Sequence, residues 1–129
     1  MKSFILASAS PRRRELLAQI GLIPADIIPA DINEDPIPGE LPRPHALRLA
    51  CEKAQKVSSE NPEKIVLASD TVVGVGRRIL PKTEDRKSAS ECLHLLSGRS
   101  HRVFTGVAVI DEMGVLRSRV SETLSLIHI

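Results

Sequence analysis

The chain has 129 residues, a net charge of +2 and a hydrophobic share of 42%, which is typical of one globular domain with a real core. The small charge argues against general binding of polyanions, and the two aromatic residues argue against stacking platforms for single-stranded nucleic acid. The apolar run at the N-terminus stops at Ser8, too short for a signal peptide or membrane span, so we expect a cytoplasmic protein that contacts neither a nucleic-acid polymer nor a membrane.

The first predicted unit is a strand followed by a helix. Residues 4–7 form a continuous apolar run, as in a strand covered on both faces. Ser10 and Pro11 supply an N-cap and a first-turn proline, so a helix should begin there and end before Gly21. Its predicted apolar stripe consists of Leu16, Leu17 and Ile20.

A second strand over residues 25–28 leads into a segment with five prolines, residues 29–44, which should be an ordered but irregular surface loop. A second helix is predicted over residues 44–57. Its predicted apolar face consists of Leu47, Ala50, Cys51, Ala54 and Val57.

The rest of the chain predicts further strands and one more helix. Residues 65–68 read as a buried strand that Ser69 and Asp70 interrupt, and residues 71–75 continue extended before a turn at 76–78. A third helix is predicted over 84–96, followed by a hairpin of strands 102–110 and 115–124. Because helices and strands alternate, the fold class is α/β with a mixed twisted sheet and flanking helices, in a single domain over residues 1–129.

The first strand-to-helix turn is a candidate anion site. A helix N-terminus presents free backbone N–H groups and the positive end of its dipole. Arg12 and Arg13 occupy this first turn, where cations are unfavourable unless an anion compensates them. Two solvated arginines are the alternative interpretation.

Carboxylates form the second candidate group. Asp70 follows a buried strand, where a side chain can project into a cleft, although a turn-forming Asp is the alternative. Glu34 and Asp35 lie in the proline-rich loop, which could fold over such a cleft. Acids gathered near phosphates usually hold magnesium. Solvated loop acids are the alternative here.

Other polar residues are less informative. Lys53 and Lys82 are each interpreted, from the local sequence, as ordinary surface lysines. The histidines lack ligand spacing, so we treat them as structural or exposed: His45, His94, His101 and His128. Cys51 and Cys92 have no C-x-x-C spacing and are interpreted as buried reduced thiols. Covalent catalysis is not expected.

Several segments together resemble a known family. Residues 6–17, Leu-Ala-Ser-Ala-Ser-Pro-Arg-Arg-Arg-Glu-Leu-Leu, resemble the opening signature of the Maf family, also called septum formation inhibitors. The further matches, in family order, are Glu34, Glu52-Lys53-Ala54, Ser69-Asp70-Thr71-Val72-Val73, Leu80-Pro81-Lys82 and residues 96–101.

The resemblance implies a fold related to the inosine triphosphate pyrophosphatases, with the active site in a cleft between two lobes. It implies a nucleoside triphosphate diphosphatase that hydrolyses its substrate to a monophosphate and pyrophosphate with a divalent cation, Mg²⁺ or Mn²⁺. By position, the implied phosphate-binding residues are Ser8, Arg12, Arg13, Lys53 and Lys82. Glu34 and Asp70 would bind metal and activate water, with Asp70 as the general base.

The resemblance also bears on specificity and on completeness. The resemblance adds Thr71 to the implied substrate-binding residues. Arg12 together with Thr71 is similar to the branch acting on dTTP and UTP, although Ser69 replaces that branch's usual alanine. The other branch, acting on methylated guanine nucleotides, carries an aromatic residue and a glutamine at these two positions. Family members continue beyond the last residues of this chain, so we expect a domain lacking the family's C-terminal third.

Three functions remain open from the sequence. They are a pyrophosphatase, a nucleotide-binding or septum-related interaction protein without turnover, and an inactive truncated remnant. The sequence leaves open whether the chain forms a homodimer.

Overall fold

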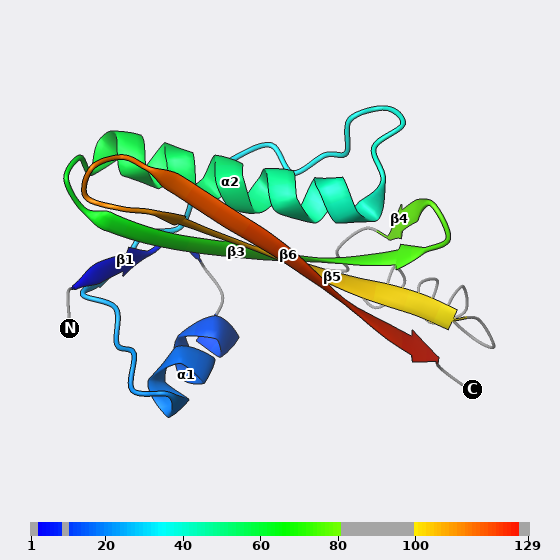
Figure 1. The fold of residues 1–129 in the computed structure, drawn as a ribbon, viewed down its shortest axis with the longest axis horizontal. Helices are drawn as coiled ribbons and strands as arrows, with labels where there is room; N and C mark the ends of the chain where they lie inside the picture. The colour runs from blue at the N-terminus through cyan, green and yellow to red at the C-terminus, as the bar shows by residue number, and fades with distance from the viewer. Residues whose placement is uncertain (1–2, 9–10, 81–99, 127–129) are drawn as a thin grey trace.

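The computed structural model describes residues 3–8, 11–80 and 100–126 (Figure 1). The predicted helix over 84–96 lies outside the described residues, as do Ser10, Lys82, Cys92, His94 and His128. The elements in chain order are β1 (Phe4–Leu6), α1 (Pro11–Gln19), β2 (Asp26–Ile27), α2 (Pro42–Glu60), β3 (Ile65–Val75), β4 (Arg78–Leu80), β5 (Ser100–Ile110) and β6 (Leu116–Leu126).

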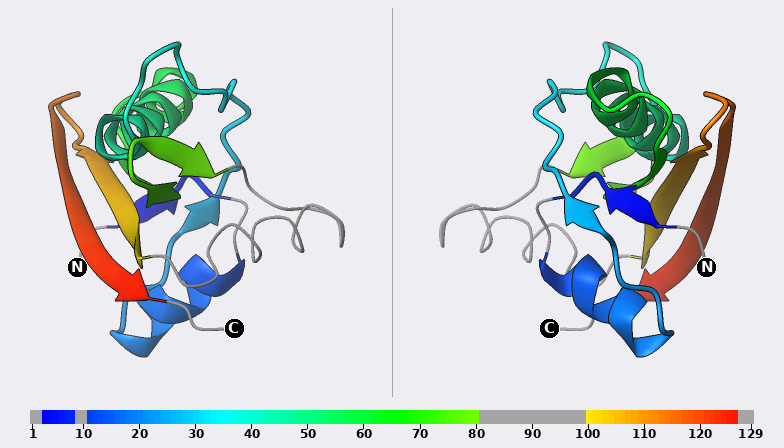
Figure 2. Two further views of the ribbon diagram at one scale, coloured as in Figure 1. Left: turned by 90° about the vertical axis from the view of Figure 1, so that its right-hand side faces the viewer. Right: turned by 90° about the vertical axis from the view of Figure 1, so that its left-hand side faces the viewer.

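The strands form one mixed sheet in the order β2-β1-β3-β5-β6, with β4 paired to β3. β1 is parallel to both β2 and β3, whereas β3–β4, β3–β5 and β5–β6 are antiparallel. Figures 1 and 2 show α2 on one face of the sheet and α1 beyond the opposite face. The predicted α/β class and the predicted hairpin are therefore confirmed.

β3 differs from the prediction, because it runs without interruption through Ser69 and Asp70. Alternate residues of β3 are buried, and Asp70 belongs to the buried set with Ala68 and Val72. The prediction of a break there was wrong, since pairing with β5 from Val66 to Gly74 keeps this backbone extended. Asp70 therefore projects from the middle of a long strand and is not a turn residue.

α2 begins at Pro42, earlier than the predicted Pro44. Pro42 and Pro44 both fit the first turn, where backbone N–H groups have no partner within the helix. The N–H of His45 donates the first backbone bond, to the carbonyl of Leu41, at 3.1 Å. The helix continues to Glu60. Because it already begins at Pro42, the last residues of the predicted proline-rich loop form its first turn.

The core lies between α2 and the sheet and consists largely of small side chains. The main cluster is Ile5, Ala7, Ala50, Ala54, Val57, Val66, Ala68, Ala108 and Ile110. A second cluster joins Ala46, Val72 and Phe104. Because alanines face the strands, the helix backbone can approach the sheet closely. The half-buried Cys51 is a free thiol packed against the main cluster, so it is less buried than predicted.

The apolar stripe predicted for α1 is not buried. Leu16 is 52% exposed and Ile20 is 70% exposed, while Leu17 is half-buried. A cavity of about 690 Å³ lies between these side chains and the face of the sheet opposite α2. Periodicity located the helix correctly, but it could not show whether a second layer packs against the apolar face.

Within the described part of the chain, no helix is both long and apolar enough to cross a membrane.

Candidate active site

The site lies along one edge of β3, at the point where the strand that pairs with this edge changes from β1 to β4. On this edge, β1 pairs with residues Ile65 to Leu67 and β4 pairs with Val73 to Val75. Among the described strands, none pairs with the edge between these two stretches. Ser69, Asp70 and Thr71 lie in this gap, beside the carboxyl end of β1. In α/β sheets such gaps at strand ends commonly form ligand-binding crevices.

Asp70 lies on the buried face of β3, with a fully buried side chain. Lys53 of α2 donates a hydrogen bond to Asp70 Oδ1 at 2.9 Å. The Lys53 side chain is only 13% exposed, so its stem lies along the helix–sheet interface and its ammonium group reaches the gap. The interpretation of Lys53 as an ordinary surface lysine was wrong.

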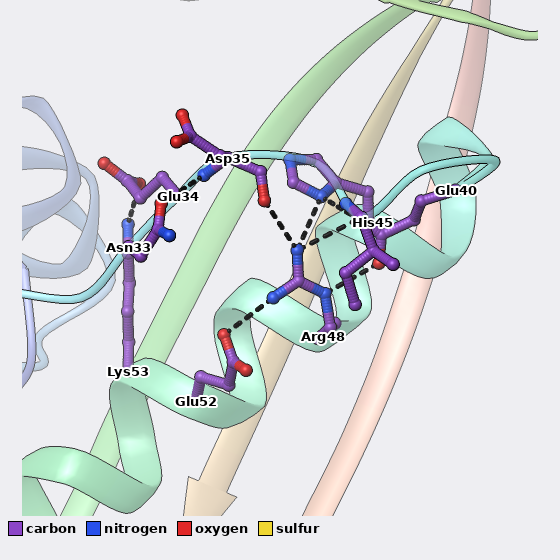
Figure 3. Close-up of polar contacts among 9 residues, drawn as sticks. Asn33, Glu34, Asp35, Glu40, His45, Arg48, Glu52 and Lys53 are labelled. Carbon is purple, nitrogen blue, oxygen red and sulfur yellow. Dashed lines mark hydrogen bonds and ion pairs between the residues drawn. The ribbon is translucent and has the colours of Figure 1, made fainter.

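Glu34 joins the same ammonium group from the proline-rich loop. Its Oε1 lies 3.0 Å from Lys53 Nζ, and its side chain is 42% exposed. Figure 3 shows the Glu34 carboxylate meeting the end of the Lys53 side chain, which rises from α2. Three segments that are distant in sequence therefore bring Glu34, Lys53 and Asp70 together.

Arg13 contacts β3 from α1. Its guanidinium donates to the backbone carbonyl of Ser69 and, at 3.0 Å, to Thr71 Oγ1. Burial lowers the pKa of Arg13 below its usual value, while the negative charges of Asp70 and Glu34 act in the opposite direction. An arginine nevertheless stays charged in proteins, so Arg13 is a cation held next to two acids.

The remaining predicted residues are placed less completely. Ser8 is buried and follows the end of β1. Arg12 belongs to the first turn of α1, and the structure describes only its backbone. Lys82 lies outside the described residues, two positions after the end of β4 at Leu80. The roles of all these residues stay predictions.

A cavity of about 330 Å³ lies against the acids. Its polar lining includes Glu34, Asp35, Asp70, Thr71 and His45. Its apolar lining is Pro36, Leu49, Val72, Ile79 and Leu80. One small space therefore combines carboxylates with apolar surface, as small-molecule sites commonly do.

The sequence predicts only a structural or exposed role for His45. It is buried at the start of α2, and its Nδ1 lies 2.6 Å from Glu40 Oε1. Glu40 also forms two hydrogen bonds with Arg48, from Nε at 2.7 Å and from Nη2 at 2.9 Å. Sequence reasoning missed this cluster, although a Glu and an Arg flanking the start of a helix were a usable signal.

The acids fit a hard divalent cation only in part. The described residues contain no group of three or more His, Cys, Asp and Glu side chains arranged to hold a metal ion. Two carboxylates do converge at one cation, the Lys53 ammonium. Magnesium commonly takes one or two carboxylates and completes its shell with substrate phosphates and water. This donor set therefore fits a cation that is shared with a phosphorylated ligand.

The comparisons with known proteins agree with this geometry. The family model described as "Maf-like protein" matches residues 3–127. A dTTP/UTP pyrophosphatase of Novosphingobium aromaticivorans is 57% identical over 93% of this chain and 60% of its own length. A dTTP/UTP pyrophosphatase of Caulobacter vibrioides is 56% identical over 94% of this chain and 63% of its own length. The chain thus spans about three-fifths of these two relatives.

Solved structures with low sequence identity share the fold. The Staphylococcus aureus Ham1 protein superposes with a TM-score of 0.65 at 14% identity, covering 98% of this chain and 72% of that protein. A nucleoside-triphosphatase (dITP/XTP pyrophosphatase) of Mycobacterium abscessus superposes with a TM-score of 0.60 at 17% identity, covering 98% and 74%. The expected fold, shared with nucleoside triphosphate pyrophosphatases, is thereby confirmed.

Proposed function

Because this chain belongs to the family of Maf-like proteins, we propose that it carries the catalytic site of a pyrophosphatase that hydrolyses dTTP and UTP. The products are the nucleoside monophosphate and pyrophosphate. One observation carries the proposal: the carboxylates of Glu34 and Asp70, which both line the cavity, meet at the ammonium group of Lys53. The names of relatives at 56–57% identity support the choice of substrate.

The reaction breaks the bond between the α-phosphorus and the oxygen that bridges to the β-phosphorus. In the proposed mechanism, Asp70 accepts a proton from a water molecule as the water oxygen attacks the α-phosphorus. The bridging oxygen leaves with pyrophosphate, and the attacking oxygen remains on the monophosphate. Asp70 suits this role because a rigid strand and the Lys53 contact fix its carboxylate in place.

The cations would hold the phosphates. Arg13 already lies beside Asp70 and Glu34, and Ser8 lies at the end of β1. We propose that Arg12, Lys53 and Lys82 join them, so that positive charge surrounds the leaving pyrophosphate. Thr71 would act by holding the Arg13 guanidinium in place.

Glu34 and Asp70 are the proposed ligands of a divalent cation, Mg²⁺ or Mn²⁺. When bound, such a cation would neutralise charge that develops on the phosphate oxygens. The Lys53 ammonium between these two carboxylates indicates that the site favours positive charge. A single Maf-like domain, a cytoplasmic location and a homodimer remain predictions.

The test is pyrophosphate release from dTTP, UTP, GTP and 7-methyl-GTP with Mg²⁺, for the wild type, Asp70→Asn and the control Asp26→Asn. Asp26 is exposed on β2, and its side chain accepts a hydrogen bond from the N–H of its neighbour Ile27. We expect release from dTTP and UTP that is lost in Asp70→Asn and kept in the control. Release that persists in Asp70→Asn would remove the general-base assignment. Nucleotide binding without release in the wild type would favour an interaction protein.

A further inference from the structure

The proline-rich loop runs along α2 and is attached to it at successive points. The Lys56 ammonium donates to the carbonyl of Asp31, Lys53 pairs with Glu34, and Arg48 donates to the carbonyl of Asp35 at 3.1 Å. The loop therefore travels from the C-terminal half of α2 towards its start, antiparallel to the helix. This path carries Glu34 past the cavity.

Arg48 makes the most contacts along this path. Besides Asp35, its guanidinium binds both carboxylate oxygens of Glu40, and it donates to Glu52 at 2.9 Å (Figure 3). Glu40 is nearly buried, with 8% of its side chain exposed. The hydrogen bond from Arg48 is the main reason that the pKa of Glu40 falls to about 2. Arg48 and Glu40 thus form a charged, two-point clamp at neutral pH.

The clamp, together with the side chain of Asn33, fixes the peptide groups that directly follow Glu34 in the loop. The N–H of Asp35 donates to Asn33 Oδ1 at 2.9 Å, and the carbonyl of Asp35 accepts from Arg48. Downstream, the N–H of Ile37 donates to Glu40 Oε1 at 3.2 Å. Both the backbone N–H and the backbone carbonyl of Asp35, the residue that follows Glu34, are therefore hydrogen-bonded.

Glu34 itself depends on this support. Its side chain is 42% exposed, so packing does not hold it in place. Asp35 is also exposed, although both acids line the cavity. Besides the ion pair to Lys53, the position of the Glu34 carboxylate therefore depends on the position of the loop backbone.

We propose that Arg48, through its bidentate pair with Glu40, is a positioning residue that holds Glu34 at the cavity beside Lys53 and Asp70. This inference rests on the proposed pyrophosphatase function. Arginine is required because its planar fork can bind Glu40 at two points and still reach the Asp35 carbonyl. Lysine offers a single point charge and cannot make all of these contacts at once.

The experiment compares the wild type with Arg48→Gln, Arg48→Lys and the double variant Glu40→Gln/Arg48→Gln. The double variant removes both charges of the Arg48–Glu40 pair, so neither partner is left as an unpaired buried charge that could unfold the protein. Arg43→Gln is the control, because the Arg43 side chain pairs with Glu122 of β6 and not with the segment around Glu34. Each protein is assayed for kcat and KM of pyrophosphate release from dTTP, and for hydrogen exchange of backbone amides in residues 33–40.

We expect all three clamp variants to exchange the loop amides at least about tenfold faster, with an intact α2. We expect kcat to fall about tenfold or more while KM changes by less than about threefold, since small displacements of catalytic groups are costly. Arg43→Gln should match the wild type in every readout. Wild-type loop exchange in both Arg48 variants would overturn the proposal, as would full kcat in the double variant.

These readouts separate the two proposals. If the wild type releases no pyrophosphate from any nucleotide, the proposed function fails, and loop exchange alone decides whether Arg48 holds the loop. If the wild type is active and Arg48→Gln lowers kcat without loosening the loop, the positioning role fails while the function stands.

Discussion

The backbone of Ala46 in α2 lies so close to Gly106 in β5 that a Cβ on Gly106 would stand 2.4 Å from the Ala46 carbonyl oxygen. Gly106 is also the direct neighbour of Asp70 across the β3–β5 ladder. The missing side chain therefore lets α2 rest on the sheet beside the candidate general base. The distance between α2 and the sheet and the geometry of the site around Asp70 therefore both depend on Gly106.

Gly106→Ala is expected to lower the free energy of unfolding by about 2 kcal/mol or more, because the methyl group meets backbone that cannot rotate away. Urea unfolding measures this. Thr105→Ser, at the neighbouring residue that points to the other face of the sheet, serves as a control with a small effect. Stability unchanged in Gly106→Ala would show that α2 can move away freely.

The Lys53–Asp70 pair should show strong coupling in a double-mutant cycle. Lys53→Met leaves the fully buried Asp70 carboxylate without this partner and should destabilise the fold by about 3 kcal/mol. Adding Asp70→Asn should recover at least about 1 kcal/mol of that loss, because the buried charge is gone. Urea unfolding of the four proteins, with the exposed Lys64→Met as a control, tests this. Additive effects would contradict a direct pair.

Glu40 should make the stability depend on pH in an acidic window. Its pKa lies near 2 in the folded chain, against an ordinary value of 4.5. A lowered pKa stabilises the fold above the unfolded value, and this contribution is lost as the pH falls from about 4.5 to about 2. We expect the wild type to exceed Glu40→Gln by about 1–2 kcal/mol at pH 6, after allowing for screening by water near the surface.

The measurement for Glu40 is urea unfolding at several pH values between 6 and about 2, where the gap between the two proteins should close. For the control Glu60→Gln, at the exposed end of α2, the free energy of unfolding should change with pH as it does in the wild type. A gap that stays constant down to the lowest pH would mean that the Glu40 carboxylate contributes no charge-dependent stability.

Thr71→Val should weaken substrate binding while leaving the fold intact. The change keeps the size of the side chain but removes the oxygen that accepts from Arg13 at 3.0 Å. A charged hydrogen bond contributes about 1.5–3 kcal/mol, so KM for dTTP should rise about tenfold. Steady-state kinetics test this, with Thr123→Val on the exposed part of β6 as the matched control. An unchanged KM would show that the hydrogen bond between Thr71 and Arg13 does not support substrate binding.

Much of the fold could be predicted locally. The apolar run that became β1, the proline-started α1 and the hairpin of β5 and β6 each follow from patterns within a few residues. Such patterns report backbone preferences and which residues avoid water. They do not report which element covers which, and for that reason the apolar stripe with Leu16 and Ile20 could be predicted, whereas the exposure of these two side chains could not.

The sequence by itself determined the family, the fold class and the candidate acids and cations, because short motifs carry these directly. Only the tertiary structure decided that Asp70 projects from the middle of β3, and that Lys53 lies between it and Glu34. It also revealed that Arg48 and Glu40 hold the loop. These relations depend on the pairing of strands and on the depth at which α2 packs, and both result from contacts between residues that are far apart in the chain.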